Sequence, residues 1–282
     1  MNRKKFIKTT LLGSIGFGAL AGIYSWKIEP FWLEFVKQKM PTLNLPPHLH
    51  GKTLMQISDI HVSNRFDDQY IIDSFKKAQK LNPDYVVYTG DYVSYENHEQ
   101  IQQLAKVLKH AVKGSVGTVG VLGNHDYGKN WKEQIVADQI AFELENVGIK
   151  ILKNSQLNIE GLNFIGFEDY WSENFFPEIV MKQYNKHQAN LVLCHNPDVC
   201  DLNIWNHYQG WILSGHTHGG QCKPPFLKAP ILPVKNKRYD QGYIDLKDGR
   251  HLYINRALGH LYQIRLNVRP EITLFTLENL SS

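Results

Sequence analysis

Short apolar runs alternate with segments of helical periodicity along most of this chain. Apolar side chains recur every three or four residues in residues 71–81, 101–108 and 135–144, and this spacing predicts three amphipathic helices. β-rich runs bounded by turn residues predict strands at 149–153, 157–160, 162–167, 240–246, 250–255 and 271–277. Together these patterns favour a layered α/β protein in which helices cover two sheets.

The first 27 residues carry a different pattern, which is typical of a membrane-targeting segment. Four basic residues within residues 3–8 precede residues 9–26, which hold no charged side chain. Such a segment is a retained membrane anchor or a signal sequence, and a buried amphipathic helix is the alternative. Residues 3–8 are similar to a twin-arginine export signal with a lysine replacing the second arginine, and residues 19–21 offer a cleavage site.

Residues 28–51 connect this segment to the rest of the chain as a linker or a first strand. The apolar side chains of residues 31–36 suit either core packing or contact with the membrane interface. Pro41, Pro46 and Pro47 stiffen the connection. We therefore expect a signal or anchor at 1–27, a linker or first strand at 28–51, and one globular domain at 52–282.

Composition narrows the class of protein. With 282 residues, of which 43% are hydrophobic and 21% charged, the chain is neither disordered nor a multi-span membrane protein. The net charge of +4 is too small to indicate a nucleic-acid partner, and it is compatible with a small anionic substrate. The three cysteines are an odd number, which argues against a disulfide framework.

Five β-rich runs each end in polar side chains of metal-ligand type. The side chains that follow these runs are Asp59, His61, Asp91, Asn124, His125, Asp126, His195, His216 and His218. Because the carboxyl ends of neighbouring strands meet at one edge of an α/β sheet, we expect a single cluster. This mixture of carboxylates, imidazoles and one amide suits divalent Mn, Fe, Zn or Mg.

Local spacing supports the same site. Asp59 and His61, like His216 and His218, are separated by one residue, so that both members of a pair can leave the same side of an extended segment. Glycines at positions 90, 123 and 215 precede ligands at sharp strand exits. At such exits the backbone needs a positive φ or a close approach to another segment.

The ligand strings together resemble the full signature of the calcineurin-like metallophosphoesterase superfamily, over residues 52–220. Further strings at 28–33, 196–198, 219–221 and 255–259 are similar to its membrane-associated bacterial branch. That branch includes twin-arginine-type phosphodiesterases and a UDP-2,3-diacylglucosamine pyrophosphatase of lipid A synthesis. The resemblance implies a four-layer sandwich of two mixed β-sheets flanked by helices, with two divalent metal ions at the strand ends.

The resemblance also implies a role for each side chain. One ion is held by Asp59, His61, Asp91 and His218, and the other by Asp91, Asn124, His195 and His216. A metal-bound hydroxide attacks phosphorus, His125 protonates the leaving group or stabilises charge, and Asp126 orients the His125 ring. Independently of the family's roles, Arg256 is a candidate contact for a substrate phosphate, with a surface salt bridge as the alternative.

Residues outside the signature favour a small amphiphilic phosphate ester as substrate. An aromatic cluster at residues 170–177 and the proline-rich apolar residues 224–233 either flank the metal site or form a satellite core. With a membrane-directed N-terminus, they favour hydrolysis of a lipid-linked phosphodiester or pyrophosphate such as UDP-2,3-diacylglucosamine. The alternatives are a general extracytoplasmic phosphodiesterase with a twin-arginine-like signal and, less favoured, a non-catalytic binding scaffold.

Overall fold

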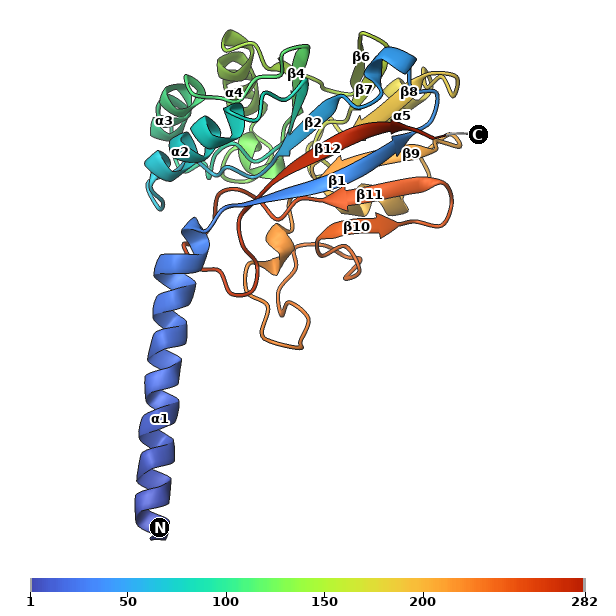
Figure 1. Ribbon diagram of the computed structural model, residues 1–282. Helices are drawn as coiled ribbons and strands as arrows, with labels where there is room; N and C mark the ends of the chain where they lie inside the picture. The colour runs from blue at the N-terminus through green and yellow to red at the C-terminus, as the bar shows by residue number, and fades with distance from the viewer. Residues whose placement is uncertain (1, 281–282) are drawn as a thin grey trace.

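The computed structural model describes residues 2–280 of the chain, in which two mixed six-stranded sheets are packed together (Figure 1). The first sheet has the strand order β1 (Glu34–Thr42), β12 (Glu271–Asn279), β2 (Thr53–Ile57), β3 (Tyr85–Thr89), β4 (Gly117–Val121) and β5 (Lys150–Ile151). The second has the order β10 (Gly242–Asp245), β11 (Arg250–Ile254), β9 (Gly210–Ser214), β8 (Ala189–Leu193), β7 (Leu162–Gly166) and β6 (Ser155–Ile159). The architecture confirms the expected pair of mixed sheets flanked by helices.

Parallel pairing dominates the centre of both sheets. Strands β2, β3, β4 and β5 run parallel, as do β7, β8, β9 and β11, whereas β12, β10 and β6 join their neighbours β2, β11 and β7 in the antiparallel sense. The central strands of the two sheets therefore end in loops that carry the polar side chains named above. This arrangement places the carboxyl ends of β2, β3, β4, β8 and β9 where a site can form.

Three helices cover the outer face of the first sheet at the positions that the periodicity predicts. They are α2 (Asp68–Gln79), α3 (Glu99–Leu108) and α4 (Gln134–Asn146). On strand β3, Val86 and Tyr88 pack with these helices, whereas Tyr85 and Val87 face the second sheet. This alternation follows from the two-residue period of a strand and gives the sheet two buried faces.

A third apolar layer closes the outer face of the second sheet. Strands β7, β8, β9 and β11 contribute to it, together with the short helix α5 (Pro177–Met181) and the turn Pro197–Asp201. Further short 3₁₀ turns lie at Pro47–Leu49, Asn124–Tyr127 and His218–Gly220. Two of these turns directly follow strand ends and carry expected site residues.

The segment at 28–51 is an integral part of the first sheet. Strand β1 pairs in parallel with β12, in a register that sets Glu34 beside Glu271. Of the apolar residues at 31–36, Phe31, Leu33 and Phe35 pack against the helix-side core, whereas Trp32 is half exposed. Core packing therefore accounts for three of these side chains, and contact of the cluster with a membrane interface stays a prediction.

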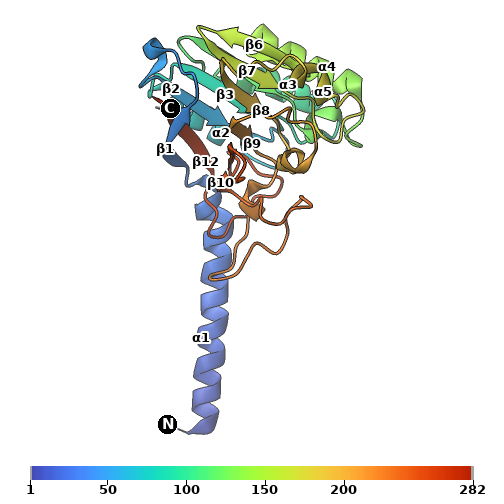
Figure 2. The same ribbon diagram turned by 90° about the vertical axis from the view of Figure 1, so that its right-hand side faces the viewer.

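Helix α1 (Arg3–Ile23) projects away from the domain as a long single rod (Figures 1 and 2). A π-helical turn at Tyr24–Ile28 and a 3₁₀ turn at Glu29–Phe31 join it to β1. Residues 7–31 are long and apolar enough to cross a membrane, and no part of the most apolar stretch is buried within the described chain. The same features are found in signal sequences, so this helix is a weak indication of an anchor or signal.

Candidate dinuclear metal centre

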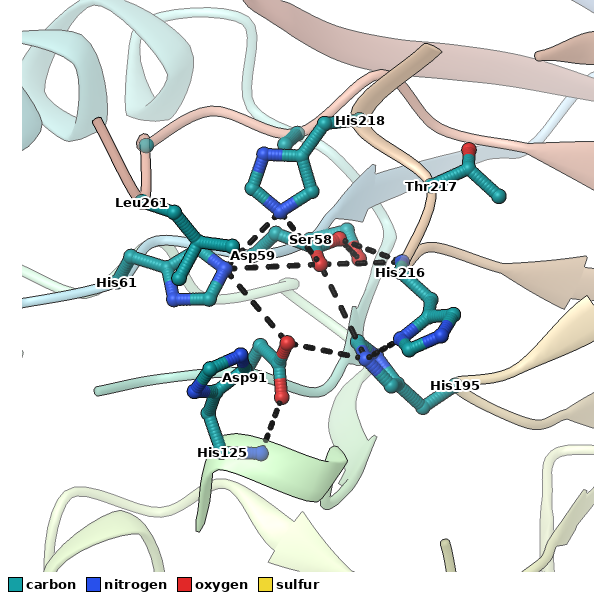
Figure 3. A network of polar contacts seen from close by, with 12 residues as sticks. Ser58, Asp59, His61, Asp91, His125, His195, His216, Thr217, His218 and Leu261 are labelled. Atoms are coloured by element: carbon teal, nitrogen blue, oxygen red, sulfur yellow. Dashed lines mark hydrogen bonds and ion pairs between the residues drawn. The ribbon is translucent and has the colours of Figure 1, made fainter. Parts of the chain in front are cut away.

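The loops at the strand ends bring six of the seven expected metal ligands together in one buried site (Figure 3). Asp59, His61 and His218 form one group of closely spaced ligand atoms, and Asp91, His195 and His216 form a second. Within each group, all ligand atoms lie within 4.8 Å of one another. Each group combines residues from both sheets, because His195 follows β8 and the residues at 216 and 218 follow β9.

Most of these ligands have a left-handed backbone, which the sequence does not predict. Instead of extended φ values, φ lies between 49° and 70° at Asp59, His61, Asp91, His216 and His218. The expectation that each pair leaves an extended segment is therefore wrong, and His216 and His218 belong to different groups. Asp and His enter this region more readily than most residues, although it is strained, and such strain concentrates at functional sites.

The first group holds two imidazole rings that are tilted by 38° to each other. The Nε2 atoms of His61 and His218 are 3.0 Å apart, and Asp59 Oδ1 lies 3.3 Å from His218 Nε2. The Asp59 carboxylate also accepts a hydrogen bond from the backbone N–H of His216 at 3.0 Å. This carboxylate therefore fixes the loop after β9 as well as facing the gap between the rings.

The second group is centred on His195. Its Nε2 lies 3.1 Å from Asp91 Oδ2 and 3.2 Å from His216 Nδ1. Asp91 Oδ2 is also 3.6 Å from His61 Nε2, so the Asp91 carboxylate lies between the two groups (Figure 3). Asn124 Oδ1 is buried without a hydrogen-bond partner within residues 2–280, as expected for an atom whose partner is a cation.

The contacts of the outer nitrogens assign the tautomers of His195 and His216. His195 Nδ1 donates to the Thr89 carbonyl at 2.7 Å, and His216 Nε2 donates to the Pro233 carbonyl at 3.0 Å. His61 Nδ1 contacts Ser94 Oγ at 3.0 Å. The two carbonyls leave His195 Nε2 and His216 Nδ1 as lone-pair donors toward the site, and the Ser94 contact orients the His61 ring so that its Nε2 faces the site. Lone pairs that face each other at about 3 Å repel unless a cation lies between them, so the residues present fit two divalent ions.

Burial sets the protonation of these rings. It lowers the pKa of His61 well below its ordinary value, and together with His195 it lowers the pKa of His216 to about 3. Both rings are therefore neutral at pH 7, which is the form that binds a metal. At His195 burial also acts to lower the pKa, but the Asp91 carboxylate outweighs it and raises the pKa well above its usual range. A cation that binds at His195 must therefore displace the proton that the ring otherwise carries beside Asp91.

His125 lies beside the two groups without belonging to either. Its backbone N–H donates to Asp91 Oδ1 at 2.9 Å, and its ring is packed edge-on to that of His61 with centroids 5.1 Å apart. Unlike the seven ligands, it is only partly buried. The ring is thus placed between the metal ligands and solvent, where a substrate can reach it.

Asp126 does not have the contact that the resemblance implies. In residues 2–280, no hydrogen bond joins its carboxylate to the His125 ring. Instead the carboxylate accepts from the backbone N–H groups of Asp91 at 3.0 Å, Tyr92 at 2.8 Å and Gly123 at 2.8 Å, with a fourth contact to Val93. The expected orienting role is therefore corrected: Asp126 fixes the loop that carries Asp91.

Two glycines allow these loops to approach each other. A Cβ atom at Gly123 would collide with the Asp91 carboxylate, and one at Gly215 would collide with Ser58 Oγ and the Asp59 carboxylate. These two positions confirm the predicted close approach at the strand exits. The ligand carboxylates fill the space that a side chain would need.

Arg256 lies outside both groups. Its guanidinium binds the carboxylates of Glu271 and Glu34, the latter at 2.9 Å. These are the contacts that the salt-bridge alternative describes, although the Arg256–Glu271 ion pair is largely buried and does not lie on the surface. A role in binding substrate phosphate stays a prediction.

Two tryptophans lie beside the site, and the sequence identifies only one of them, Trp171. Trp171, part of the expected aromatic cluster, packs edge-on to His216 with ring centroids 4.8 Å apart. Trp131 stacks on Trp171 at 4.9 Å and also contacts His125 at 6.0 Å. Trp131 borders a cavity of about 500 Å³ that also includes Arg65 and Lys129. No motif signals Trp131, because its place depends on the loop after the Asn124–Tyr127 turn.

Comparisons with known proteins agree with this geometry. Residues 52–220 match the family model described as calcineurin-like phosphoesterase. The chain is 29% identical to phosphodiesterase YaeI of Escherichia coli (strain K12), over 98% of this chain and 99% of that protein. It is 28% identical to the uncharacterized metallophosphoesterase YkuE of Bacillus subtilis (strain 168), over 99% and 98%. It is 26% identical to UDP-2,3-diacylglucosamine pyrophosphatase LpxG of Chlamydia trachomatis serovar D, over 95% and 98%.

Proposed function

This chain belongs to the calcineurin-like phosphoesterase family, and from that premise we propose that it hydrolyses a phosphodiester or pyrophosphate bond in an amphiphilic, lipid-linked substrate. The coarser activity, metal-dependent hydrolysis of phosphoric esters or diphosphates, follows from the family and from its phosphodiesterase and pyrophosphatase relatives. The observation that carries the proposal is the pair of buried ligand groups, which share the Asp91 carboxylate between them.

The protein's own residues would hold two divalent cations. One would be bound by Asp59, His61, Asp91 and His218, and the other by Asp91, Asn124, His195 and His216. When bound, the cations supply Lewis-acid polarisation of the phosphoryl group and a nucleophile at neutral pH. The donor set of carboxylate, imidazole and amide suits Mn, Fe, Zn or Mg.

We propose His125 as the side chain that acts on the leaving group. It is partly exposed and next to the ligands, so its ring can reach the oxygen that departs from phosphorus. Burial lowers the pKa of His125 and Asp91 opposes that shift. We assign this ring to protonate the leaving oxygen or to stabilise its charge.

Two features favour a lipid-linked substrate. The pyrophosphatase LpxG, whose name gives a diacylated sugar nucleotide as substrate, aligns along nearly all of both chains. Helix α1 is apolar enough to hold the protein at a membrane, where such a lipid resides. We therefore propose UDP-2,3-diacylglucosamine, a precursor of lipid A, as the model substrate and residues 1–27 as the anchor.

A general extracytoplasmic phosphodiesterase is the second candidate. The 29% identity to phosphodiesterase YaeI and the twin-arginine-like residues 3–8 favour it. In that case residues 1–27 would be an export signal, and the substrate would be a phosphodiester on the far side of the membrane. The two candidates share the metal site and differ in product.

One assay separates these candidates. Full-length protein in detergent micelles with Mn²⁺ is tested in parallel on UDP-2,3-diacylglucosamine, an aryl phosphodiester and an aryl phosphomonoester. Release of UMP and the lipid phosphate, abolished by a chelator, is the expected result. Cleavage of the aryl phosphodiester alone would favour the general diesterase, and no hydrolysis of any of the three would refute the proposal.

A matched pair of variants controls the assay. Asp91→Asn should lower the metal content, and it should lower kcat by at least about 10²-fold, because the shared carboxylate charge is lost. Asp73→Asn, at an exposed position of α2, should leave both unchanged. Full metal content with normal turnover in the Asp91 variant would contradict its bridging position.

A further inference from the structure

The loop after the metal site presents large apolar side chains to solvent. We call residues 223–234 the contact loop. Phe226 is fully exposed, Ile231 is 77% exposed and Leu227 is 66% exposed. Prolines at 224, 225, 230 and 233 restrict the loop backbone, so these side chains cannot easily fold back onto the domain. Apolar side chains grouped in this way normally mark a surface that something covers.

The contact loop projects from the same end of the domain as α1. Both views show the orange loop on the side of the domain from which α1 projects, near the end of the rod that joins the domain (Figures 1 and 2). Hydrogen bonds connect the two. Gln263 Nε2 donates to the Trp26 carbonyl at 3.0 Å, and Arg265 N donates to the Ser25 carbonyl at 2.9 Å. Leu266, in that same segment, bonds the start of the contact loop through Lys223 N at 2.8 Å.

Exposed aromatic and apolar side chains also occur in the two segments that link the contact loop to α1. Trp26 and Ile28 at the base of α1 are at least half exposed, and so is Tyr262 in the connecting segment. Amphipathic aromatic rings of this kind concentrate where a membrane meets water. Exposed apolar side chains are therefore present at both ends of the hydrogen-bonded connection between residues 25–26, residues 263–266 and the contact loop.

Basic side chains surround the apolar tip. A cavity of about 520 Å³ is bordered by Lys223, Lys228, Lys237 and Arg238, with Asp240 as its acidic member. Lys223 is paired with Asp240 at 2.7 Å, and Lys237 Nζ donates to the Leu232 carbonyl. Within residues 2–280, no ion pair engages Lys228 or Arg238, so both charges are available to an anionic group.

The contact loop also touches the metal site directly. The Pro233 carbonyl accepts the hydrogen bond from His216 Nε2 at 3.0 Å. On the other side of the surface, the backbone N–H of Gly259 donates to the Asp59 carbonyl at 2.8 Å, just before the segment that packs on α1. The site and the apolar surface are thus joined by single hydrogen bonds at both ends.

We propose that the contact loop is a second membrane-binding element, which inserts Phe226, Leu227 and Ile231 into an anionic lipid bilayer beside α1. Continuity with the base of α1 orients the loop toward the bilayer, and Lys228 and Arg238 meet lipid phosphates. The metal site then lies at the bilayer surface, and an acylated substrate enters it from the lipid side. This last step rests on the proposed function, whereas the membrane contact does not.

The contact is tested by labelling the full-length protein. In a Cys222→Ser background, whose two other cysteines are buried, an environment-sensitive dye is attached to Phe226→Cys and, as matched control, to Phe142→Cys. Phe142 is 62% exposed on α4, a helix that covers the outer face of the first sheet. The protein is reconstituted in phosphatidylcholine vesicles that contain about one-quarter phosphatidylglycerol and spin-labelled lipid.

The expected result is strong quenching of the dye at position 226 and almost none at position 142. Equal quenching at both positions would overturn the proposal. So would a dye at 226 that becomes shielded only as the protein-to-lipid ratio rises, because a second copy of the chain would then cover the loop. Lys228→Gln with Arg238→Gln should remove the extra quenching that phosphatidylglycerol gives over phosphatidylcholine alone.

A kinetic test separates this inference from the proposed function. The triple variant Phe226→Ser, Leu227→Ser and Ile231→Ser should keep kcat/KM on a soluble aryl phosphodiester within about twofold, because none of the three touches a metal ligand. On UDP-2,3-diacylglucosamine in vesicles, its kcat/KM should fall about tenfold or more. Equal rates of both proteins on the lipid would overturn the membrane role and leave the function standing. A quenched dye at position 226 without hydrolysis of the lipid would support the membrane contact and overturn the proposed function.

Discussion

At three histidines of the candidate metal site, one ring nitrogen contacts the surrounding fold and the other faces the ligand groups. Thr89 and Pro233 use backbone carbonyls for this purpose, and Ser94 uses its hydroxyl. Each ring is therefore oriented before a metal arrives. Preorientation of this kind commonly changes metal affinity by about 10–100-fold.

His125→Ala should slow catalysis without emptying the site. Its ring lies beside the ligands but in neither ligand group, so kcat should fall about 10²–10⁴-fold, the usual scale for a positioned general acid. Metal content, measured by elemental analysis of the purified variant, should match that of the original protein. An unchanged kcat would remove His125 from the reaction, and a loss of metal would make it a ligand.

The ligand side chains can be predicted from sequence, but their surroundings cannot. Each ligand follows a β-rich run, and carboxyl ends of parallel strands meet, so their convergence follows from simple geometry. Ser94 and Trp131 carry no such signal, because loops position them. The role expected for Asp126, orientation of the His125 ring, could not be checked from the sequence either. Its carboxylate accepts hydrogen bonds from backbone N–H groups, and no side-chain motif reveals such contacts.

At the scale of the elements, the first residue of helix α2, Asp68, is a carboxylate whose pKa is raised. Burial and the neighbouring Asp67 raise the pKa of Asp68 to about 6, while Lys106 opposes the shift. The folded chain thus binds this proton more tightly than the unfolded chain, whose value is 3.8. Stability from this group is complete below pH 3.8 and is lost as the pH rises to about 6.

Asp68→Asn should therefore stabilise the protein more at high pH than at low pH. The difference in melting temperature between variant and original protein should shift in favour of the variant between about pH 4 and pH 6, and then stay constant. Thermal melts across this range measure it, and the comparison of two proteins cancels the titration of all other groups. A difference that does not change with pH would contradict the shift.

The segment at 256–268 depends on one buried guanidinium. Arg265 donates to the carbonyl oxygens of Gly259 at 2.8 Å, Arg256 at 2.9 Å and Val268 at 3.1 Å, and also contacts Ala257 and His260. This segment holds the base of α1 on one side and the Asp59 loop on the other. A single side chain thus substitutes for regular secondary structure.

Arg265→Met should lower the free energy of unfolding by at least about 3 kcal/mol, because several buried carbonyls lose their donors together. Arg265→Lys, which keeps a charged donor, should lose less. Urea unfolding of the detergent-solubilised protein measures both. A loss below about 1 kcal/mol for the methionine variant would mean that water replaces the guanidinium.

The predicted elements match the observed ones where the periodicity is long, and differ at their ends. Helix α2 ends at Gln79 and not at residue 81, because the backbone N–H groups of Leu81 and Asn82 bond three residues back, to Ala78 and Gln79, and Asn82 then leaves the helical region with φ of 45°. For the residues of strand β1 the sequence allows either a linker or a first strand, since the nine residues include Pro41 and the partner strand, β12, lies near the opposite end of the chain. Only long-range pairing identifies such a strand.

For the whole molecule, the metal site is also a connection between the two sheets. Asp59, His61 and Asp91 belong to the first sheet, whereas His195, His216 and His218 belong to the second. Cations bound by both groups would tie the halves of the sandwich together. Binding of this kind adds about 2.7 kcal/mol of stability when free metal exceeds its dissociation constant about 100-fold.

Chelation should therefore lower the melting temperature as well as the activity. A fall of about 5–10 °C is expected for a domain of this size, and Mn²⁺ should restore both properties. Differential scanning fluorimetry with and without chelator measures the shift, and Asp91→Asn should show a smaller one. Loss of activity with an unchanged melting temperature would mean that the sheets hold together without the ions.

The pairing of β1 with β12 has a consequence for the order of assembly. Strand β12 lies between β1 and β2, so both of these early strands lack their neighbour until residues 271–279 have left the ribosome. By then α1 and the loops of the site have long been synthesised, yet in the first sheet the edges of β1 and β2 that face β12 are still unpaired. Completion of the domain is thus a late, single event, governed by closure of a very long loop.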